Sequence, residues 1–427
     1  MTDQGRAGRP LAEHTGQGPS LAGARVLAIA PTPFFSDYGC HVRIAEEIAG
    51  LHAFCVDTSL VTYPFGRDLA DIPTHRAPRL GGPRRISPGS SLHKFSMDAT
   101  LAGLALRVGR RVRPHLVHGH LHEGALIGYV VARRRRVPLV FDFQGSLTAE
   151  MIDHGFLSPR SPAFRVFRAL ERWIVAHADV IVTSTTHGAD LLVRDFGRPA
   201  DSIVVVPDGV NTQRFRPAWE DAGGPGENQI RALRQRLGLP DAKHTVVYLG
   251  LLAEYQGITH LLRAIETLAD RHVDAHYVIM GFPGEERYRI LARRLGIDAY
   301  VTFTGAVPYE QAGAYLALGD LAVSPKLSLT EGNGKLVNYM AMGLPIVVYD
   351  SPVSRETLGE LGIYAPSGDW SALAVEIERA LSDPGALVEQ GRALRARAIA
   401  LFGWERSAAR LAEVYERAIN GAAKTRR

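Results

Sequence analysis

The stretch LTEGNGKLVNYMAMGLPIVVYD, from Leu329 to Asp350, carries the clearest structural signal in this chain. It places Glu331 in a glycine-rich turn, and the helical spacing of GKLVNYMAM that follows ends at Gly343. The next run, PIVVY, has the apolar character of a buried strand, and LAVSP just before the turn predicts another strand. A strand, a helix and a second strand in this order predict one unit of a parallel α/β sheet.

The same alternation extends in both directions along the chain. Eight more short apolar runs are predicted strands: RVLAIAP, HLVHGHL, PLVFDFQG, ADVIVTS, IVVVPDGV, TVVYLGLL, HYVIMG and YVTFTG. Segments with helical spacing separate most of them. The pattern predicts an α/β protein with two doubly wound parallel sheets.

One irregular segment, RPAWEDAGGPGENQ, interrupts this alternation. We expect it to join two domains, since 427 residues are too many for one ordinary core. The predicted organisation is a disordered tail, an N-terminal domain, a linker, a C-terminal domain, and a terminal helix with a short tail. These parts occupy residues 1–22, 23–215, 216–230, 231–403 and 404–427.

The composition narrows the class of protein. A net charge of +5 suits an acidic ligand or an anionic membrane surface, and it does not imply a nucleic-acid partner. The two cysteines, Cys40 and Cys55, give neither a disulfide framework nor zinc spacing, so a reduced cytoplasmic compartment is expected. No run is long enough to span a bilayer, so any membrane contact would be peripheral, at the inner face.

Two α/β domains predict a cleft, because ligands of parallel sheets bind at the carboxyl ends of the strands. Gly39 opens the first predicted helix, whose free amide groups favour anions, although an ordinary strand-to-helix turn would look the same. No G-x-G-x-x-G follows a strand in either half, which argues against a dehydrogenase.

A dense polar cluster follows the strand HLVHGHL. If that strand continues far enough, alternation puts His118, His120 and His122 on one side, with Glu123 next to them. Three histidines on one extended strand seldom converge on one ion, so no metal is predicted. Contact with sugar hydroxyls or acid/base work fits the position, although one or two of the histidines can be structural.

Two other turns hold residue types that bind polyhydroxylated ligands. They are Asp142, Gln144, Ser146 and Glu150 in one turn, and Asp208, Gly209 and Asn211 in the other. The same residue types serve equally well in turns and caps, and the sequence leaves both interpretations open.

The glycine-rich turn is more informative. The amide groups of Gly334, Lys335 and Leu336 lie at the predicted helix start and can hold a diphosphate, to which Lys335 adds charge. Glu331 cannot hold phosphate, so it must bind hydroxyls or stabilise a developing cation. A sugar meets both demands, whereas a capping role fits poorly because Glu331 lies outside the first helical turn.

The segments around this turn, together with HYVIMGFPG, YVTFTGAVPYEQAGAYLALGDLAVSP and IVVVPDGVNTQRFRP, resemble the group 1 (family 4) glycosyltransferases of the GT-B fold. The resemblance runs from about Arg25 to the terminal helix. It implies two Rossmann-like domains facing a central cleft, with the C-terminal helix packing across. It also implies transfer of a hexosyl unit from a nucleotide sugar with retention, in surface polysaccharide or glycoconjugate biosynthesis. Neither a metal nor a separate cofactor is implied.

The resemblance assigns the donor to the C-terminal domain. Glu331 matches the family glutamate beside the transferred sugar, and Asn338 stands where a second glutamate usually holds the ribose. The other expected donor contacts are Gly39, Gly281, Gly305, Asn333, Gly334, Lys335 and Leu336.

Two departures affect the diphosphate. Leu251 and Gln256 occupy the places of a family arginine and lysine. Losing two charge-assisted contacts costs about 1.5–3 kcal/mol each, so we expect Lys335, the helix amides and Lys326 to replace them. The base-side loop also reads Gly305-Ala306-Val307 and lacks its usual arginine.

On the acceptor side, His120 matches the family's catalytic histidine, with His122 as the alternative one strand step away. Glu123, Gln144, Asp208 and Asn211 are the other expected acceptor or sugar contacts. Basic and apolar residues mix in SPRSPAFRVFRALERWIVAHAD, a pattern that suits either solvated helix ends or peripheral docking on anionic lipid. Under the second hypothesis the acceptor is lipid-linked, and a saccharide acceptor is the other expectation.

Two alternatives stay open. A non-catalytic GT-B relative, serving as a binding or partner subunit, would explain the missing arginine and lysine. A GT-B sugar-nucleotide epimerase would share the fold, although the pattern from Glu331 to Gly343 favours transfer.

Overall fold

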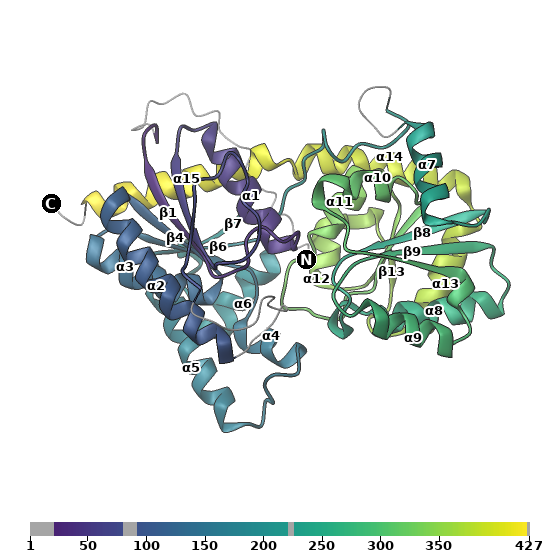
Figure 1. Cartoon of the computed structure of the whole chain (residues 1–427), viewed down its shortest axis with the longest axis horizontal. Helices are drawn as coiled ribbons and strands as arrows, with labels where there is room; N and C mark the ends of the chain where they lie inside the picture. The colour runs from purple at the N-terminus through teal and green to yellow at the C-terminus, as the bar shows by residue number, and fades with distance from the viewer. Residues whose placement is uncertain (1–20, 80–91, 221–225, 425–427) are drawn as a thin grey trace, which may run out of the picture.

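The computed structural model describes residues 21–79, 92–220 and 226–424, which form two α/β domains side by side (Figure 1). The first sheet has the strand order β3-β2-β1-β4-β5-β6-β7 and the second has the order β10-β9-β8-β11-β12-β13. Neighbouring strands in both sheets run parallel. The predicted pair of Rossmann-like domains is therefore confirmed.

The strands of the N-terminal domain are short and mostly buried. They are β1 (Arg25–Ala30), β2 (Asp57–Thr62), β3 (Thr74–Arg76), β4 (Leu116–His120), β5 (Leu139–Phe143), β6 (Val180–Thr183) and β7 (Ile203–Val205). The strands of the C-terminal domain are β8 (His244–Leu249), β9 (Ala275–Met280), β10 (Val301–Gly305), β11 (Leu321–Ser324), β12 (Ile346–Tyr349) and β13 (Ile363–Ala365).

Helices cover both faces of each sheet, as the continuous apolar strands require. The N-terminal domain contains α1 (Gly39–His52), α2 (Leu92–Val112), α3 (Leu121–Arg135), α4 (Leu147–Asp153), α5 (Pro162–His177) and α6 (Thr186–Phe196). Apolar residues of α2, α3, α5 and α6 pack with the strands in one core cluster.

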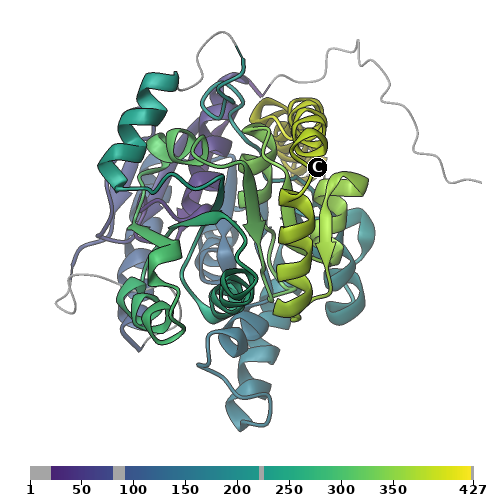
Figure 2. The same cartoon turned by 90° about the vertical axis from the view of Figure 1, so that its right-hand side faces the viewer.

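In the C-terminal domain, α8 (Ile258–Asp270), α9 (Glu285–Arg294) and α13 (Trp370–Leu381) pack on one face. The other face carries α7 (Glu227–Leu237), α10 (Ala312–Leu316), α11 (Lys335–Ala341), α12 (Pro352–Leu358) and α14 (Pro384–Leu401). Figure 2 shows this domain end-on, with helices on both sides of its sheet.

The last helix, α15 (Trp404–Lys424), returns to the N-terminal domain and lies along it (Figure 1). Its Leu411 and Tyr415 pack against Val140 and Val182 of the first sheet. Because these side chains are almost fully buried, the helix covers a face of that sheet that α1 alone leaves open. The expected packing of the C-terminal helix across the molecule is confirmed.

The connection between the domains is held by side chains. Arg395 of α14 donates hydrogen bonds to the carbonyl oxygens of Phe215, Thr212 and Ala341, and it pairs with Glu220. Helix α7 begins at Glu227, inside the segment 216–230 expected to be a linker. The domain boundaries themselves stay predictions, and the predicted disordered tail falls mostly on residues 1–20, outside the described residues.

Candidate active site

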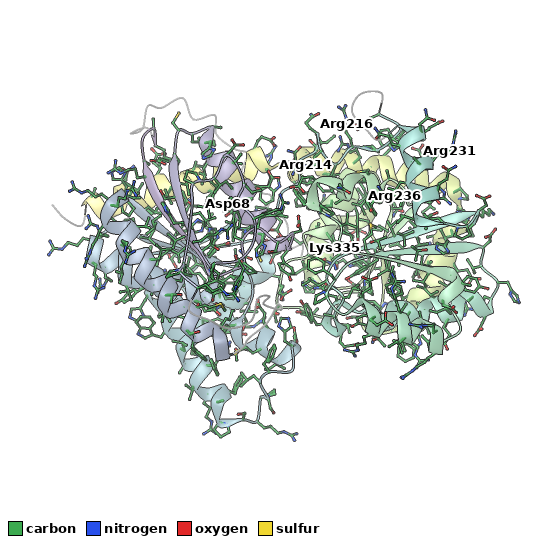
Figure 3. All side chains as sticks on the ribbon, in the orientation of Figure 1. Asp68, Arg214, Arg216, Arg231, Arg236 and Lys335 are labelled. Atoms are coloured by element: carbon green, nitrogen blue, oxygen red, sulfur yellow. The ribbon has the colours of Figure 1, made fainter. Side chains whose placement is uncertain are left out.

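A cavity of about 430 Å³ lies between the two domains, at the carboxyl ends of several strands of both sheets. Its wall joins the residues after β1, β4 and β5 to those after β8, β9 and β11. This is the place that the parallel topology predicts for a ligand. Figure 3 shows Lys335 in the C-terminal domain, on the side that faces the N-terminal domain.

Lys335 is the first residue of α11 and lines the cavity. Its Nζ donates a hydrogen bond to Gln256 Oε1 at 2.6 Å and lies 4.8 Å from the ring centroid of Tyr248. Burial and, to a smaller extent, the charge of Lys326 lower the pKa of Lys335 to about 7, while Glu331 acts in the opposite direction. Near neutral pH the amine is thus poised to gain a proton when an anion arrives.

Glu331 is held in place by the second lysine of this wall. Lys326 follows β11, and its Nζ lies 3.0 Å from Glu331 Oε2 and 2.7 Å from the carbonyl oxygen of Gly332. The lysine is almost buried, whereas the carboxylate keeps access to the cavity. This pair fixes one acceptor of hydrogen bonds at the position expected for a sugar hydroxyl.

The two domains touch at glycine positions around Glu331. A Cβ atom on Gly145 would lie 2.8 Å from Glu150 Oε1 and 3.1 Å from Glu331 Cγ. A Cβ atom on Gly332 would lie 2.7 Å from Ser184 Oγ. A side chain at either position would therefore force neighbouring groups at the domain contact to shift.

Glu150 lies beside Glu331 but comes from the other domain. Burial raises the pKa of Glu150 well above its ordinary value, and the charge of Glu331 raises it further. A protonated Glu150 can donate a hydrogen bond, and the carboxyl oxygens of Glu331 can accept one. Together they can bind two hydroxyls of one sugar ring.

The N-terminal wall contains a half-buried ion pair and a buried histidine. Lys94 Nζ lies 2.7 Å from Glu123 Oε1. Burial alone would raise the pKa of Glu123, but Lys94 outweighs it and the pKa is lowered. His122 lies 3.6 Å from Glu171, and burial lowers its pKa, so the imidazole is neutral. This wall offers fixed polar groups to a hydroxylated acceptor.

The expectation that three histidines share one side of a strand is wrong. Strand β4 ends at His120, and Leu121 takes φ 59°, so the chain turns into α3 before His122. His122 lies on the cavity wall, whereas His120 is not part of it and forms a hydrogen bond with Asp142 at 3.0 Å. The geometry favours His122, the alternative register, for contact with a sugar.

Three other expected contacts also lie off the cavity wall. Asn211 Oδ1 accepts hydrogen bonds from the amides of Gln213 and Arg214, which is a turn role. Leu336 is fully buried in the core, and Gly305 lies against Glu285. The wall does contain the remaining expected residues: Gly39, His122, Glu123, Gln144, Asp208, Gly281, Glu331, Asn333, Gly334, Lys335 and Asn338. Their individual roles stay predictions.

Sequence reasoning missed Lys94 and Arg43 of this wall. Lys94 pairs with the expected Glu123 across 29 residues, and no local pattern predicts that contact. Arg43 of α1 is buried and donates to Asp208 Oδ1 at 2.8 Å. The sequence does contain a signal for Arg43, because this charged residue interrupts the apolar face of the predicted helix GCHVRIAEEIAG.

Comparison with protein families matches both domains. Residues 38–209 match the family described as "Glycosyl transferase 4-like domain", and residues 229–399 match "Glycosyl transferases group 1". The chain is 30% identical over 320 residues to a D-inositol 3-phosphate glycosyltransferase of Streptomyces bingchenggensis, covering 72% of this chain and 67% of the relative.

Solved structures share the whole architecture. The sucrose-phosphate synthase of Thermosynechococcus elongatus superposes with a TM-score of 0.78 at 20% identity, covering 93% of this chain and 100% of the other. Anabaena HepE in complex with UDP-glucose gives a TM-score of 0.68 at 17% identity, covering 94% and 99%. At these identities the likeness concerns the fold.

Proposed function

The chain belongs to the group 1 glycosyltransferases, and on that premise we propose that its cavity transfers a hexosyl unit from a nucleotide sugar to a saccharide or lipid-linked acceptor with retention. The observation that carries this proposal is the placement of Lys335, Lys326 and Glu331 on one wall of an interdomain cavity. Two cations beside one carboxylate match a diphosphate joined to a sugar.

The missing arginine and lysine do not leave the diphosphate site without charge. Lys335 reaches Gln256, the residue at the family lysine's place, so its ammonium can take over that position. The hydrogen bond to Gln256 orients the amine, and the ring of Tyr248 stabilises its charged form. The placement of Lys335 therefore favours an active donor site over the alternative of a non-catalytic relative.

The proposed reaction proceeds on one face of the sugar. The bond between the anomeric carbon and the phosphate oxygen breaks while an acceptor hydroxyl bonds to the same face of that carbon. The hydroxyl proton passes to the departing phosphate oxygen. Lys335 and Lys326 neutralise the charge that develops on the phosphate, and Glu331 with Glu150 holds the ring.

On the N-terminal wall of the cavity, His122 and Gln144 are the side chains that position the acceptor. A neutral His122 can accept or donate one hydrogen bond to an acceptor hydroxyl. Gln144 donates to Asp142 Oδ2 at 2.7 Å, which leaves its carbonyl oxygen to accept from a hydroxyl. Since the relative's name specifies an inositol phosphate, that compound belongs in an acceptor screen beside sugars and lipid-linked sugars.

A peripheral membrane contact is the proposed setting for a lipid-linked acceptor. Val166 and Trp173 of α5 are exposed, and Arg165 and Arg172 flank them. Apolar and basic residues on one exposed helix suit anionic lipid. Among the described residues, no helix combines the length and the apolar character that crossing a bilayer requires.

The deciding experiment is a calorimetric screen of the full chain against UDP-, GDP-, ADP- and TDP-sugars, followed by transfer assays with the donor that binds. We expect saturable binding of one nucleotide sugar, and product with retained anomeric configuration by NMR. Folded protein that binds none of these donors would overturn the proposal.

A further inference from the structure

A second group of ionisable side chains lies behind the sheet of the N-terminal domain. Glu47 of α1, His118 and His120 of β4 and Asp142 of β5 are each no more than 2% exposed. Each offers one metal-ligating atom, and these four atoms all lie within 4.8 Å of one another. None of the four residues lies on the cavity wall.

The hydrogen bonds divide the atoms of this cluster into two sets. His118 Nδ1 is paired with Tyr415 Oη at 2.7 Å, and His120 Nδ1 is paired with Asp142 Oδ2 at 3.0 Å. The Nε2 atoms of both histidines and Glu47 Oε2 have no hydrogen-bond partner among the described residues, whereas Glu47 Oε1 lies 3.0 Å from Arg43. Buried polar atoms without a partner are costly, so three of them together indicate a missing ligand.

From this arrangement we propose that Glu47, His118 and His120 bind a divalent transition metal, zinc in the first instance. Two imidazole nitrogens and a carboxylate are a zinc ligand set. In a His-x-His pair on one strand both rings point to the same side, and here their centroids are 4.1 Å apart. Glu47 supplies the third ligand from α1.

The surrounding partners are those that a zinc site requires. A ligating histidine usually donates its other ring N–H to a carboxylate or another oxygen, which fixes the tautomer. Asp142 does this for His120, and the Tyr415 hydroxyl does it for His118. Zinc–nitrogen and zinc–oxygen distances of about 2.0–2.2 Å require the ligand atoms to move inward by about 1 Å.

The charges nearby favour a dication. Arg43 faces the cluster and contacts Glu47 at 3.0 Å, Asp142 at 3.2 Å and Asp208 at 2.8 Å. Three carboxylates thus surround one guanidinium beside the two histidines. A divalent ion would lie next to these carboxylates, although Arg43 itself opposes the ion.

The metal would join three segments that are far apart in the sequence. Its ligands come from α1 and β4, and Tyr415 ties α15 to His118. We assign the site a structural role, because its ligands lie off the cavity wall and it would fix α15 on the N-terminal domain. This proposal is independent of the donor and of the acceptor.

The test uses untagged full-length protein purified without chelators. We expect about one zinc per chain by inductively coupled plasma mass spectrometry. Dialysis against EDTA should lower the Tm, and zinc, but not magnesium, should restore it. In Glu47→Gln and His118→Gln the bound zinc should fall at least tenfold, whereas His276→Gln, a buried histidine of the other domain, should keep it.

Another transition metal at one equivalent, lost in the same two variants, supports the same site. Wild-type protein that carries less than a tenth of an equivalent of any metal and gains no Tm from added zinc would overturn the proposal. Full metal content in folded Glu47→Gln would do the same. If the variants fail to fold, the absorption of a cobalt-substituted wild-type protein reports whether nitrogen and oxygen ligands surround the ion.

Discussion

Lys335 Nζ lies 2.6 Å from Gln256 Oε1, although 79 residues separate the two in the sequence. The resemblance implies that Gln256 stands in the place of a cationic residue, and Lys335 brings an amine to that place from another helix. In the proposed function, this amine supplies the charge that holds the diphosphate.

Removing this amine should weaken donor binding. For Lys335→Met we expect a 10- to 100-fold rise in the Kd for the nucleotide sugar, since a charge-assisted hydrogen bond contributes about 1.5–3 kcal/mol. Calorimetry measures it directly. The exposed Lys243→Met is the matched control and should bind as the wild type does. Equal affinities in the two variants would contradict the role of Lys335.

Donor binding should depend on pH through the same amine. The pKa of Lys335 is lowered to about 7 in the free protein, so the charged form is present below pH 7 and is lost as pH rises above it. A bound diphosphate favours the charged form, so binding takes up a proton above pH 7. Affinity should then fall by up to about tenfold per pH unit.

Calorimetry in two buffers of different ionisation enthalpy detects that proton. Lys335→Met should show neither the proton uptake nor the pH-dependent loss of affinity. A flat affinity profile in the wild type, between about pH 6.5 and 8.5, would show that the amine is already charged in the free protein.

Glu331 and Glu150 should contribute to recognition of the sugar. Replacing either of them should leave the affinity for the nucleotide nearly unchanged. In Glu331→Gln and Glu150→Gln we expect kcat/KM for the preferred donor to fall at least tenfold, while the Kd of the nucleoside diphosphate changes less than twofold. The reason is that both side chains meet at Gly145, and the proposed function assigns them to the sugar and the two lysines to the phosphates. A large loss of nucleoside diphosphate affinity in either variant would place that residue at the phosphates.

Replacing His122 should lower the turnover number, kcat. His122→Asn keeps a polar side chain of similar size but loses the imidazole, so we expect kcat to fall at least tenfold with little change in donor Kd. His260→Asn, in the C-terminal domain and off the cavity wall, is the control and should turn over normally. An unchanged kcat in His122→Asn would show that His122 is not needed for turnover and that another group acts in its place.

Membrane binding should depend on α5. We expect the wild type to cosediment with phosphatidylglycerol vesicles at moderate salt, and Val166→Asp to lose at least fivefold in bound fraction, because it puts a charge on the apolar patch. Val388→Asp alters another exposed valine, on α14, and should bind normally. Similar binding by the wild type and both variants would show that α5 does not make the membrane contact.

The sequence by itself determined the class of fold and the place of the site. Strands and helices are recognised from their own periodicity, so PIVVY becomes β12 and Gly343, at φ 64°, follows the end of α11 as predicted. Parallel strands also place their carboxyl ends at one edge, which is why most of the expected residues meet at one cavity.

Only the tertiary structure decided which side chains act together. The positive φ of Leu121 separates His122 from His118 and His120, and strand alternation cannot reveal such a break. The pairs Lys335–Gln256 and Lys94–Glu123 depend on which strands lie side by side, and so does the meeting of Tyr415 with His118. Local patterns specify each element, but these contacts form only when elements distant in the sequence close around shared cores.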